Sequence, residues 1–362
     1  MVRFFSVLLG LGLLLNQPAA APASGGQEPA TVRAVGNPFF DREEVVELTL
    51  KLPLEAVLND RGPTPRPHPA ALSYRDARAT LQELAVQVEV RGNRRKDPAV
   101  CGFPPLLIKF PPETRAGHLF GEVAELKLTT HCLSDTYTLR EYFVYKLYNI
   151  LTDMSFRVRL CRITYRDVRG KSRASEQYGF FLETSAAMAL RNQATVVPKR
   201  LLIGMENMDS KAVATMAFFQ YMVGNTDWSV PFRHNIRVVS PDQRAAPVPV
   251  AYDFDYCGLV MAPYAVPPEQ LGITSVRHRL FRGPDFPPET YAAVRDLFNA
   301  RRSALYNVYL ACPYLSPDEK SFATRYLDGF YKTLNDPKDF ERQIARVGYR
   351  NAKRYTHIRG FD

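Results

Sequence analysis

The order of hydrophobic patterns along the chain is the feature that most constrains the fold. The first half carries runs in which apolar and polar residues alternate, whereas the second half carries apolar residues mainly at helical spacing. This segregation favours an α+β architecture over alternating β–α–β units, which would mix the two patterns throughout. A length of 362 residues suits two domains or one unit of two parts.

Strand patterns dominate the chain before residue 185. The clearest is at residues 84–90, where Val86, Val88 and Val90 share one face and polar side chains lie between them. Further strands are predicted over residues 45–52, 106–110, 124–130, 156–165 and 178–182. The proline-rich residues 62–69 predict a loop or a polyproline segment.

Helical patterns appear once in the first half and repeatedly in the second. A helix is predicted from Ser134 or Asp135, because apolar residues recur at helical spacing from residue 139 to residue 151. In the second half, helices are predicted over residues 211–223, 288–311, 316–334 and 337–353, and two short strands over 234–239 and 248–252. Pro288, Pro317 and Pro337 each suit a first helical turn.

The N-terminus has the pattern of a secretory signal. Arg3 precedes an apolar run over residues 4–15, and Ala21-Pro22-Ala23 offers the small residues that signal peptidase requires. We therefore expect a cleaved signal peptide over residues 1–23, a flexible lead over 24–40, and export to the periplasm or the extracellular space. A retained N-terminal anchor is the alternative. No second apolar run reaches the roughly 20 residues of a membrane span, so stable membrane insertion after cleavage is not expected.

Charge and cysteine content narrow the function classes. The formal net charge of +10 favours anionic partners, and because no nucleic-acid motif is present, a phosphate-handling site is preferred over nucleic-acid binding. The five cysteines and six histidines lack metal-binding spacing, which argues against a zinc site. Cys101 and Cys132 flank predicted strands and are candidates for a disulfide in an oxidising compartment. Cys257 is expected to be a buried thiol.

Residues 218–258 carry the strongest chemical signal. Asp227 lies just past the end of a predicted helix, Asn235 opens a strand 8 residues later, and Asp253 and Asp255 follow the next strand. Carboxylate and amide oxygens are ligands for divalent cations, and one remaining carboxylate can orient or deprotonate a hydroxyl. Phosphoryl transfer uses such a set, because positioning and metal-based charge neutralisation supply most of its catalysis.

These residues carry a resemblance to a known family. Asn225-Thr226-Asp227-Trp228, His234-Asn235 and Asp253-Phe254-Asp255 resemble the catalytic and metal-binding loops of atypical protein kinases of the CotH (spore-coat protein H) and HipA type. Arg91-Gly92-Asn93 and the Lys-x-x-Phe-like element around Lys109 resemble CotH-like N-lobes. The resemblance covers about residues 80–260. The chain also resembles a group of exported bacterial proteins that share Cys-x-Phe-Pro-Pro-Leu, Lys-Leu-x-Thr-His-Cys and Glu-Tyr-x-x-Tyr motifs, at 101–106, 127–132 and 141–145 here.

The resemblance implies a two-lobed protein-kinase-like fold, with a strand-rich N-lobe over residues 41–185 that holds one central helix and a helical C-lobe over 186–362. It also implies ATP or another nucleotide as ligand, with Mg²⁺ or Mn²⁺, and a protein or small-molecule hydroxyl acceptor. Asp227 would then be the catalytic carboxylate. Asn235 and Asp253 would bind the metal, and Asp255 would be a further ligand.

The phosphate-binding side is implied in the same way. Lys127 would contact the α- and β-phosphates and pair with Glu141 on the following helix, and Lys109 is the rival lysine. The turn that begins at Arg91 would cover the phosphates. Arg94, Arg95 and Lys96 are predicted to form a solvated turn, with contact to the phosphates as the alternative. His234 is predicted to be a satisfied polar residue rather than a ligand.

Three functions are compatible with these residues. The leading one is an exported atypical kinase that transfers phosphate from a metal-bound nucleotide to a hydroxyl. The second is a pseudokinase that serves as a binding or assembly module, because the 8-residue spacing from Asp227 to Asn235 exceeds the roughly 5 residues usual in kinase loops. The third is a metal-dependent phosphoesterase built on the same acids.

Overall fold

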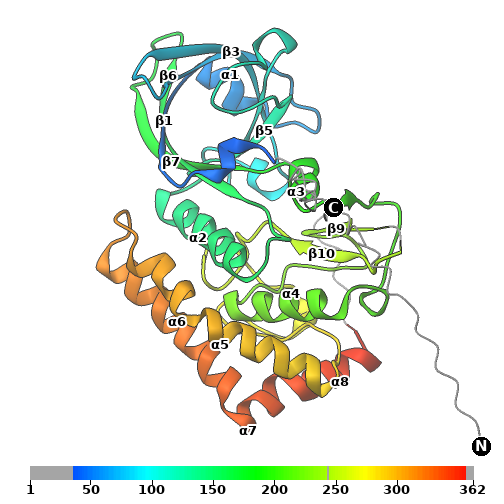
Figure 1. Cartoon of the computed structure of the whole chain (residues 1–362). Coiled ribbons are helices and arrows are strands. Elements are labelled where there is room, and N and C mark those ends of the chain that lie inside the picture. The colour runs from blue at the N-terminus through cyan, green and yellow to red at the C-terminus, as the bar shows by residue number, and fades with distance from the viewer. Residues whose placement is uncertain (1–35, 243, 356–362) are drawn as a thin grey trace, which may run out of the picture. The chain divides into compact units, whose positions relative to one another are not determined.

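Seven β-strands close into a barrel in the computed structural model, which describes residues 36–242 and 244–355 (Figure 1). All of these residues belong to the unit of the chain that spans residues 34–362. The strands are β1 Val46–Leu52, β2 His68–Arg75, β3 Leu81–Val90, β4 Leu106–Lys109, β5 Glu125–Thr129, β6 Val158–Asp167 and β7 Ser175–Leu182. They follow the order β1-β2-β3-β4-β5-β7-β6, and β1 closes the barrel by pairing in parallel with β6.

The barrel strands form because apolar side chains on one face of each strand can be buried together. In β3, Val86, Val88 and Val90 are buried as predicted, and Gln87 between them is exposed. In β1 the same alternation buries every second residue from Val46 to Leu52. These side chains share one hydrophobic core with residues of the other strands.

The predicted fold class is wrong. A two-lobed protein-kinase-like fold was expected, with a strand-rich N-lobe that holds one central helix and a helical C-lobe. Residues 41–185 instead contain the closed barrel, and the helix α2 (Asp135–Leu151) packs against β7 and against the helices of the second half. Two features that local patterns do not predict separate the observed fold from the expected one. Strand β1 pairs with β6, which is more than a hundred residues away, and β2 begins inside the proline-rich segment that predicted a loop.

Most helices lie in the second half of the chain, as its periodicity predicts. They surround α4 (Ser210–Val223), which is buried continuously from Val213 to Val223. The long helices α5 (Pro288–Leu310) and α6 (Pro317–Asn335) each begin with the predicted proline. The expected helix over 337–353 is divided into α7 (Pro337–Phe340), a π-helical turn and α8 (Arg346–Lys353). The shorter helices are α1 (Leu54–Asn59) and α3 (Ser185–Arg191).

A small sheet, ordered β10-β9-β8, positions residues of the candidate site. Its strands are β8 Thr195–Val196, β9 Ile236–Ser240 and β10 Val248–Ala251. β9 and β10 are antiparallel, and Ile236 lies opposite Ala251. The residues just beyond this pair, Asn235 and Tyr252, therefore lie at the same end of the sheet, and the Tyr252 amide donates to the Asn235 carbonyl at 3.0 Å.

The predicted signal peptide, residues 1–23, lies outside the described residues, as do residues 24–35 of the predicted lead. The described end of that lead contains a short 3₁₀ helix, Pro38–Asp41, in which Phe39 and Phe40 are buried in the core of the barrel. Residues 38–40 therefore belong to the fold rather than to a flexible lead. Among the described residues, no helix combines the length and apolar character that a membrane crossing requires.

Candidate functional site

A strongly charged cleft of about 350 Å³ lies between the loop after β3, strand β5 and the end of the β9–β10 sheet. Its carboxylates are Asp227, Asp253 and Asp255, and its basic residues are Arg91, Arg94, Arg95, Lys127, Lys199, Arg233 and Arg237. Because basic groups outnumber acidic ones, the cleft attracts anions. Six predicted site residues line it: Arg91, Lys127, Asp227, Asn235, Asp253 and Asp255.

The turn after α4 places Asp227 at the cleft. Helix α4 ends at Gly224, whose φ of 70° lies in the left-handed region that favours glycine. The Asn225 side-chain oxygen then accepts a hydrogen bond from the Asp227 amide at 3.0 Å, which fixes the turn. The buried guanidinium of Arg282 donates to the Thr226 carbonyl at 2.6 Å and supports the same segment.

The 8-residue interval between Asp227 and Asn235 is closed by a small loop. The backbones of Ser229 and His234 exchange two hydrogen bonds, at 3.0 and 3.1 Å, so the intervening residues turn away. The Asn235 side-chain nitrogen donates to the Asp227 carbonyl at 2.8 Å and to Asp227 Oδ2 at 3.0 Å. His234 Nε2 lies 2.7 Å from Asp227 Oδ1. Both carboxylate oxygens of Asp227 are therefore oriented.

Asn235 and Asp253 flank the paired strands β9 and β10 in unusual backbone conformations. Their φ angles are 52° and 64°, which non-glycine residues rarely adopt. The Asp253 amide donates to the hydroxyl oxygen of Tyr145, on α2, at 2.8 Å. Strain of this kind persists only where surrounding contacts hold it, and it is concentrated at functional sites.

Arg95 is the central cation of a buried cluster beside the cleft. Its guanidinium contacts Glu141 at 3.0 Å, Asp253 at 2.9 Å and Asp255 at 3.3 Å. The side chains of Arg95, Glu141 and Asp255 are 10%, 4% and 9% exposed, whereas that of Asp253 is 37% exposed. The Tyr264 hydroxyl also donates to Asp255 at 3.0 Å. Asp253 thus connects the cluster to the cleft.

Burial and charge compete within the cluster. Burial raises the pKa of Asp255 well above its usual value and also raises the pKa of Glu141, although the Arg95 guanidinium opposes both shifts. For Arg95, burial lowers the pKa, but the neighbouring carboxylates of Asp255 and Glu141 raise it more, so Arg95 stays charged. The folded state depends on this cation, because its removal would leave buried carboxylates without a partner.

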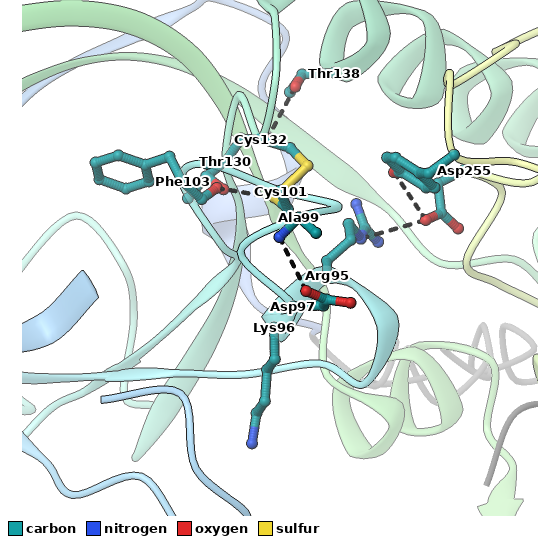
Figure 2. The surroundings of a disulfide bond; sticks show 12 residues. Arg95, Lys96, Asp97, Ala99, Cys101, Phe103, Thr130, Cys132, Thr138 and Asp255 are labelled. Carbon is teal, nitrogen blue, oxygen red and sulfur yellow. Dashed lines mark hydrogen bonds and ion pairs between the residues drawn. A yellow bond between two sulfur atoms is a disulfide. The ribbon is translucent and has the colours of Figure 1, made fainter. Parts of the chain in front are cut away.

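A disulfide holds the loop that carries Arg95. Cys101 and Cys132, which the sequence offers as candidates for a disulfide, form one, with Cα atoms 4.9 Å apart and a sequence separation of 31. Figure 2 shows Arg95 on this loop, its guanidinium directed toward Asp255. The Phe103 amide adds a hydrogen bond to the Cys132 carbonyl at 3.1 Å. The loop is therefore joined to the segment that leads into α2, which carries Glu141.

The phosphate-binding side differs in its pairing from the sequence prediction. Lys127 lies on β5 and lines the cleft, but Glu141 pairs with Arg95 rather than with Lys127. Within the described chain, Lys127 forms no ion pair; burial, followed by the charges of Arg91 and Arg237, lowers its pKa to about 8. Burial also lowers the pKa of Arg91. Both cations line the cleft.

Lys109, the rival lysine, does not line the cleft. It lies on β4 and pairs with Glu89 of β3 at 2.8 Å. Strand β4 pairs with β5, which carries Lys127, and Lys109 lies opposite Glu125. The two lysines therefore lie at different positions along the barrel wall.

Two of the three predicted metal ligands suit a divalent cation. Among the described residues, one carboxylate oxygen of Asp253 has no protein partner, and the side-chain oxygen of Asn235 has none either, since only its nitrogen is hydrogen-bonded. Asp255 does not fit as a direct ligand while Arg95 and Tyr264 hold it. Across residues 36–242 and 244–355, no group of three or more His, Cys, Asp or Glu side chains is arranged to hold a metal. Mg²⁺ commonly uses one or two protein oxygens and completes its shell with phosphate and water.

The sequence analysis did not predict that Arg95 pairs with buried carboxylates or that His234 contacts Asp227. Arg95 was expected in a solvated turn, and no local signal separates it from its exposed neighbour Arg94. His234 is satisfied, as predicted, but its partner is the candidate catalytic carboxylate Asp227. Its position directly before Asn235 was the available signal. Lys199, Arg233 and Arg237 were also missed.

No protein-family model matches the sequence, and no curated protein matches it. The resemblance to CotH- and HipA-type kinases therefore has no support from a family model. Among solved structures, the chain is similar to the Helicobacter pylori proinflammatory kinase CtkA, with a TM-score of 0.35 and 10% identity. That match covers 80% of this chain and 93% of the other.

Proposed function

We propose that this protein transfers a phosphoryl group from a metal-bound nucleotide to a hydroxyl acceptor. The observation that carries the proposal is a single cleft lined by Asp227, Asn235 and Asp253 together with the cations Arg91 and Lys127. Phosphoryl transfer depends mainly on positioning and on neutralising phosphate charge. An oriented carboxylate, oxygen ligands and two cations that line one cleft supply both.

Asp227 is the residue we assign to the acceptor hydroxyl. Its oxygens accept from His234 and Asn235, at 2.7 and 3.0 Å, and an ionised carboxylate retains further lone pairs for a hydroxyl proton. His234 and Asn235 act as positioning residues, because they fix the direction of those lone pairs. General-base assistance of this kind contributes about 10²–10⁴-fold in rate.

Arg91 and Lys127 are assigned to the phosphates of the donor. Asn235 and Asp253 would hold Mg²⁺ or Mn²⁺ through their uncommitted oxygens, and the metal would neutralise charge on the donor phosphates. Asp253 has the exposure that this role needs, since 37% of its side chain is open to solvent.

A second candidate function is a nucleotide-binding module without transfer. The observation that favours it is Arg95, which already contacts both Asp253 and Asp255. A cation at that position competes with a metal for the same carboxylates. Such a protein would bind nucleotide at the cations of the cleft but would not position a metal for transfer.

Transfer of label from γ-labelled ATP, with Mn²⁺ or Mg²⁺, tests the proposal. Asp227→Asn should reduce transfer by at least 10²-fold with nucleotide affinity retained, whereas Asp253→Asn should weaken metal-dependent nucleotide binding. Asp296→Asn, an exposed carboxylate on α5, is the matched control and should change neither. Nucleotide binding without transfer would favour the binding module. The absence of both nucleotide binding and phosphoryl transfer would contradict both candidate functions.

We further propose that the protein is exported. The disulfide between Cys101 and Cys132 supports this, because disulfides persist in oxidising compartments. N-terminal sequencing of the protein from its native host should begin at Ser24. An intact Met1 on protein recovered from the cytoplasm would contradict export.

A further inference from the structure

One wall of the cleft carries three basic side chains that the proposed transfer does not use. Lys199, Arg233 and Arg237 all line the cleft, and among the residues that the structure describes none of them has a carboxylate partner. Arg95, in contrast, contacts three carboxylates. The two cationic regions therefore differ: one is neutralised internally, and the other is open to a ligand.

Arg233 is the most deeply buried of the three basic residues. It is only 4% exposed, yet in the described part of the chain its Nε is buried without a hydrogen-bond partner, and its Nη2 donates to the Leu201 carbonyl at 2.7 Å. Its φ of 54° is in the left-handed region, which is unfavourable for a residue of this size. A buried guanidinium in such a setting requires an anion to offset the cost of desolvation.

Arg237 and Lys199 extend the same basic wall. Arg237 donates to the Tyr252 hydroxyl at 2.8 Å and lies 4.6 Å from the centre of its ring, which fixes the guanidinium without neutralising it. Lys199 is exposed at the edge of the cleft. Burial and, after it, the charge of Arg237 lower the pKa of both Lys199 and Arg233, as expected for cations close together.

We infer that Lys199, Arg233 and Arg237 form an anion subsite of the cleft that binds a phosphate-type oxyanion. The inference deepens the proposed function and rests on it for the identity of the ligand. The oxyanion is carried either by the hydroxyl acceptor or by the donor as an additional phosphate. A planar guanidinium fork beside a flexible ammonium is a combination suited to phosphate oxygens.

Isothermal titration of the full chain with inorganic phosphate, in EDTA, tests the subsite. The wild type should bind phosphate without metal, and Lys199→Gln and Arg237→Gln should each weaken binding about tenfold or more. Lys211→Gln, an exposed lysine on α4, is the matched control and should leave binding unchanged. Because Lys199 is exposed, its variant keeps the test valid even if replacement of Arg237 impairs folding. Phosphate affinity that is the same in Lys199→Gln and the wild type would overturn the subsite.

A second titration identifies the carrier of the oxyanion. It repeats the measurement with the cleft saturated by Mg²⁺ and a non-hydrolysable ATP analogue. Phosphate binding that persists and still depends on Lys199 assigns the subsite to an anionic acceptor. Phosphate binding that is displaced assigns it to the donor, in which case tripolyphosphate should bind more tightly than inorganic phosphate.

The subsite and the proposed function fail in different ways. Phosphate binding that depends on Lys199, with no phosphoryl transfer under any condition, would leave the subsite standing and overturn the transfer. Transfer that depends on Asp227, with phosphate binding insensitive to Lys199 and Arg237, would overturn only the subsite.

Discussion

Replacing Arg95 by methionine should lower the free energy of unfolding by about 3–5 kcal/mol. The guanidinium contacts Glu141, Asp253 and Asp255 at 3.0, 2.9 and 3.3 Å, and its side chain is only 10% exposed. Methionine retains the aliphatic stem but leaves these carboxylates without a counter-charge. Removing one partner of a buried ion pair is costly because the other charge stays buried and unpaired.

The loss should depend on pH in a defined direction. Burial raises the pKa values of both Glu141 and Asp255, so the folded state binds more protons than the unfolded state. Stability therefore falls as the pH rises above about 4, the pKa of these carboxyl groups in the unfolded chain. Without Arg95 the pKa values of both carboxyl groups should rise further. The difference in unfolding free energy between Arg95→Met and the wild type should therefore be larger at pH 7.5 than at pH 5.

Urea unfolding followed by tryptophan fluorescence measures this difference. The chain has one tryptophan, Trp228, which is fully buried next to Asp227, so its emission reports the core beside the site. Arg295→Met, at an exposed position on α5, is the matched control and should change stability by less than about 0.5 kcal/mol. A double variant with Glu141→Gln should recover part of the loss, with a coupling of about 1–3 kcal/mol. Equal stability of Arg95→Met and the control, or a loss that grows toward low pH, would refute the reasoning.

The disulfide, Lys127 and His234 each give a further test. Replacing Cys101 and Cys132 by serine should lower the free energy of unfolding by about 3–4 kcal/mol, because the bond closes a long loop, and unchanged urea midpoints would contradict this. Nucleotide affinity should fall as the pH rises through about 8, because Lys127 loses its proton there. Lys127→Met should remove that dependence. A wild-type nucleotide affinity that stays constant between pH 7 and 9 would show that Lys127 does not contact the phosphates. His234→Ala should reduce kcat about 10- to 100-fold through the lost hydrogen bond to Asp227 while KM for the donor stays constant, and an effect confined to KM would argue against a positioning role.

Local patterns in the sequence were sufficient for most individual elements. The alternation in β3, the Ser134 cap of α2 and the prolines that begin α5 and α6 all appear where the patterns predict them. Each depends on interactions within a few residues, namely strand alternation, a cap hydrogen bond and the fixed φ of proline. Such interactions can be read directly from the order of the residues.

Part of the candidate site is local in the same sense. Asp227, Asn235 and Asp253 fall within one stretch in which α4 ends and the adjacent strands β9 and β10 pair, so their neighbourhood follows from chain connectivity. Their order therefore pointed to one site. The contact between Asp227 and Asn235 still required the loop closed by Ser229 and His234.

The sequence by itself determined most of the elements, the acidic and amide residues of the candidate site, and the basic character of the chain. Only the tertiary structure decided that the strands close into a barrel and that Arg95, rather than Lys127, pairs with Glu141. Arg95 is 46 residues from Glu141 and 158 residues from Asp253. Contacts over such separations depend on which strands pair and on which loops the disulfide joins. Local periodicity predicts neither the strand pairing nor the loops that the disulfide joins, because it indicates only which face of each element is apolar.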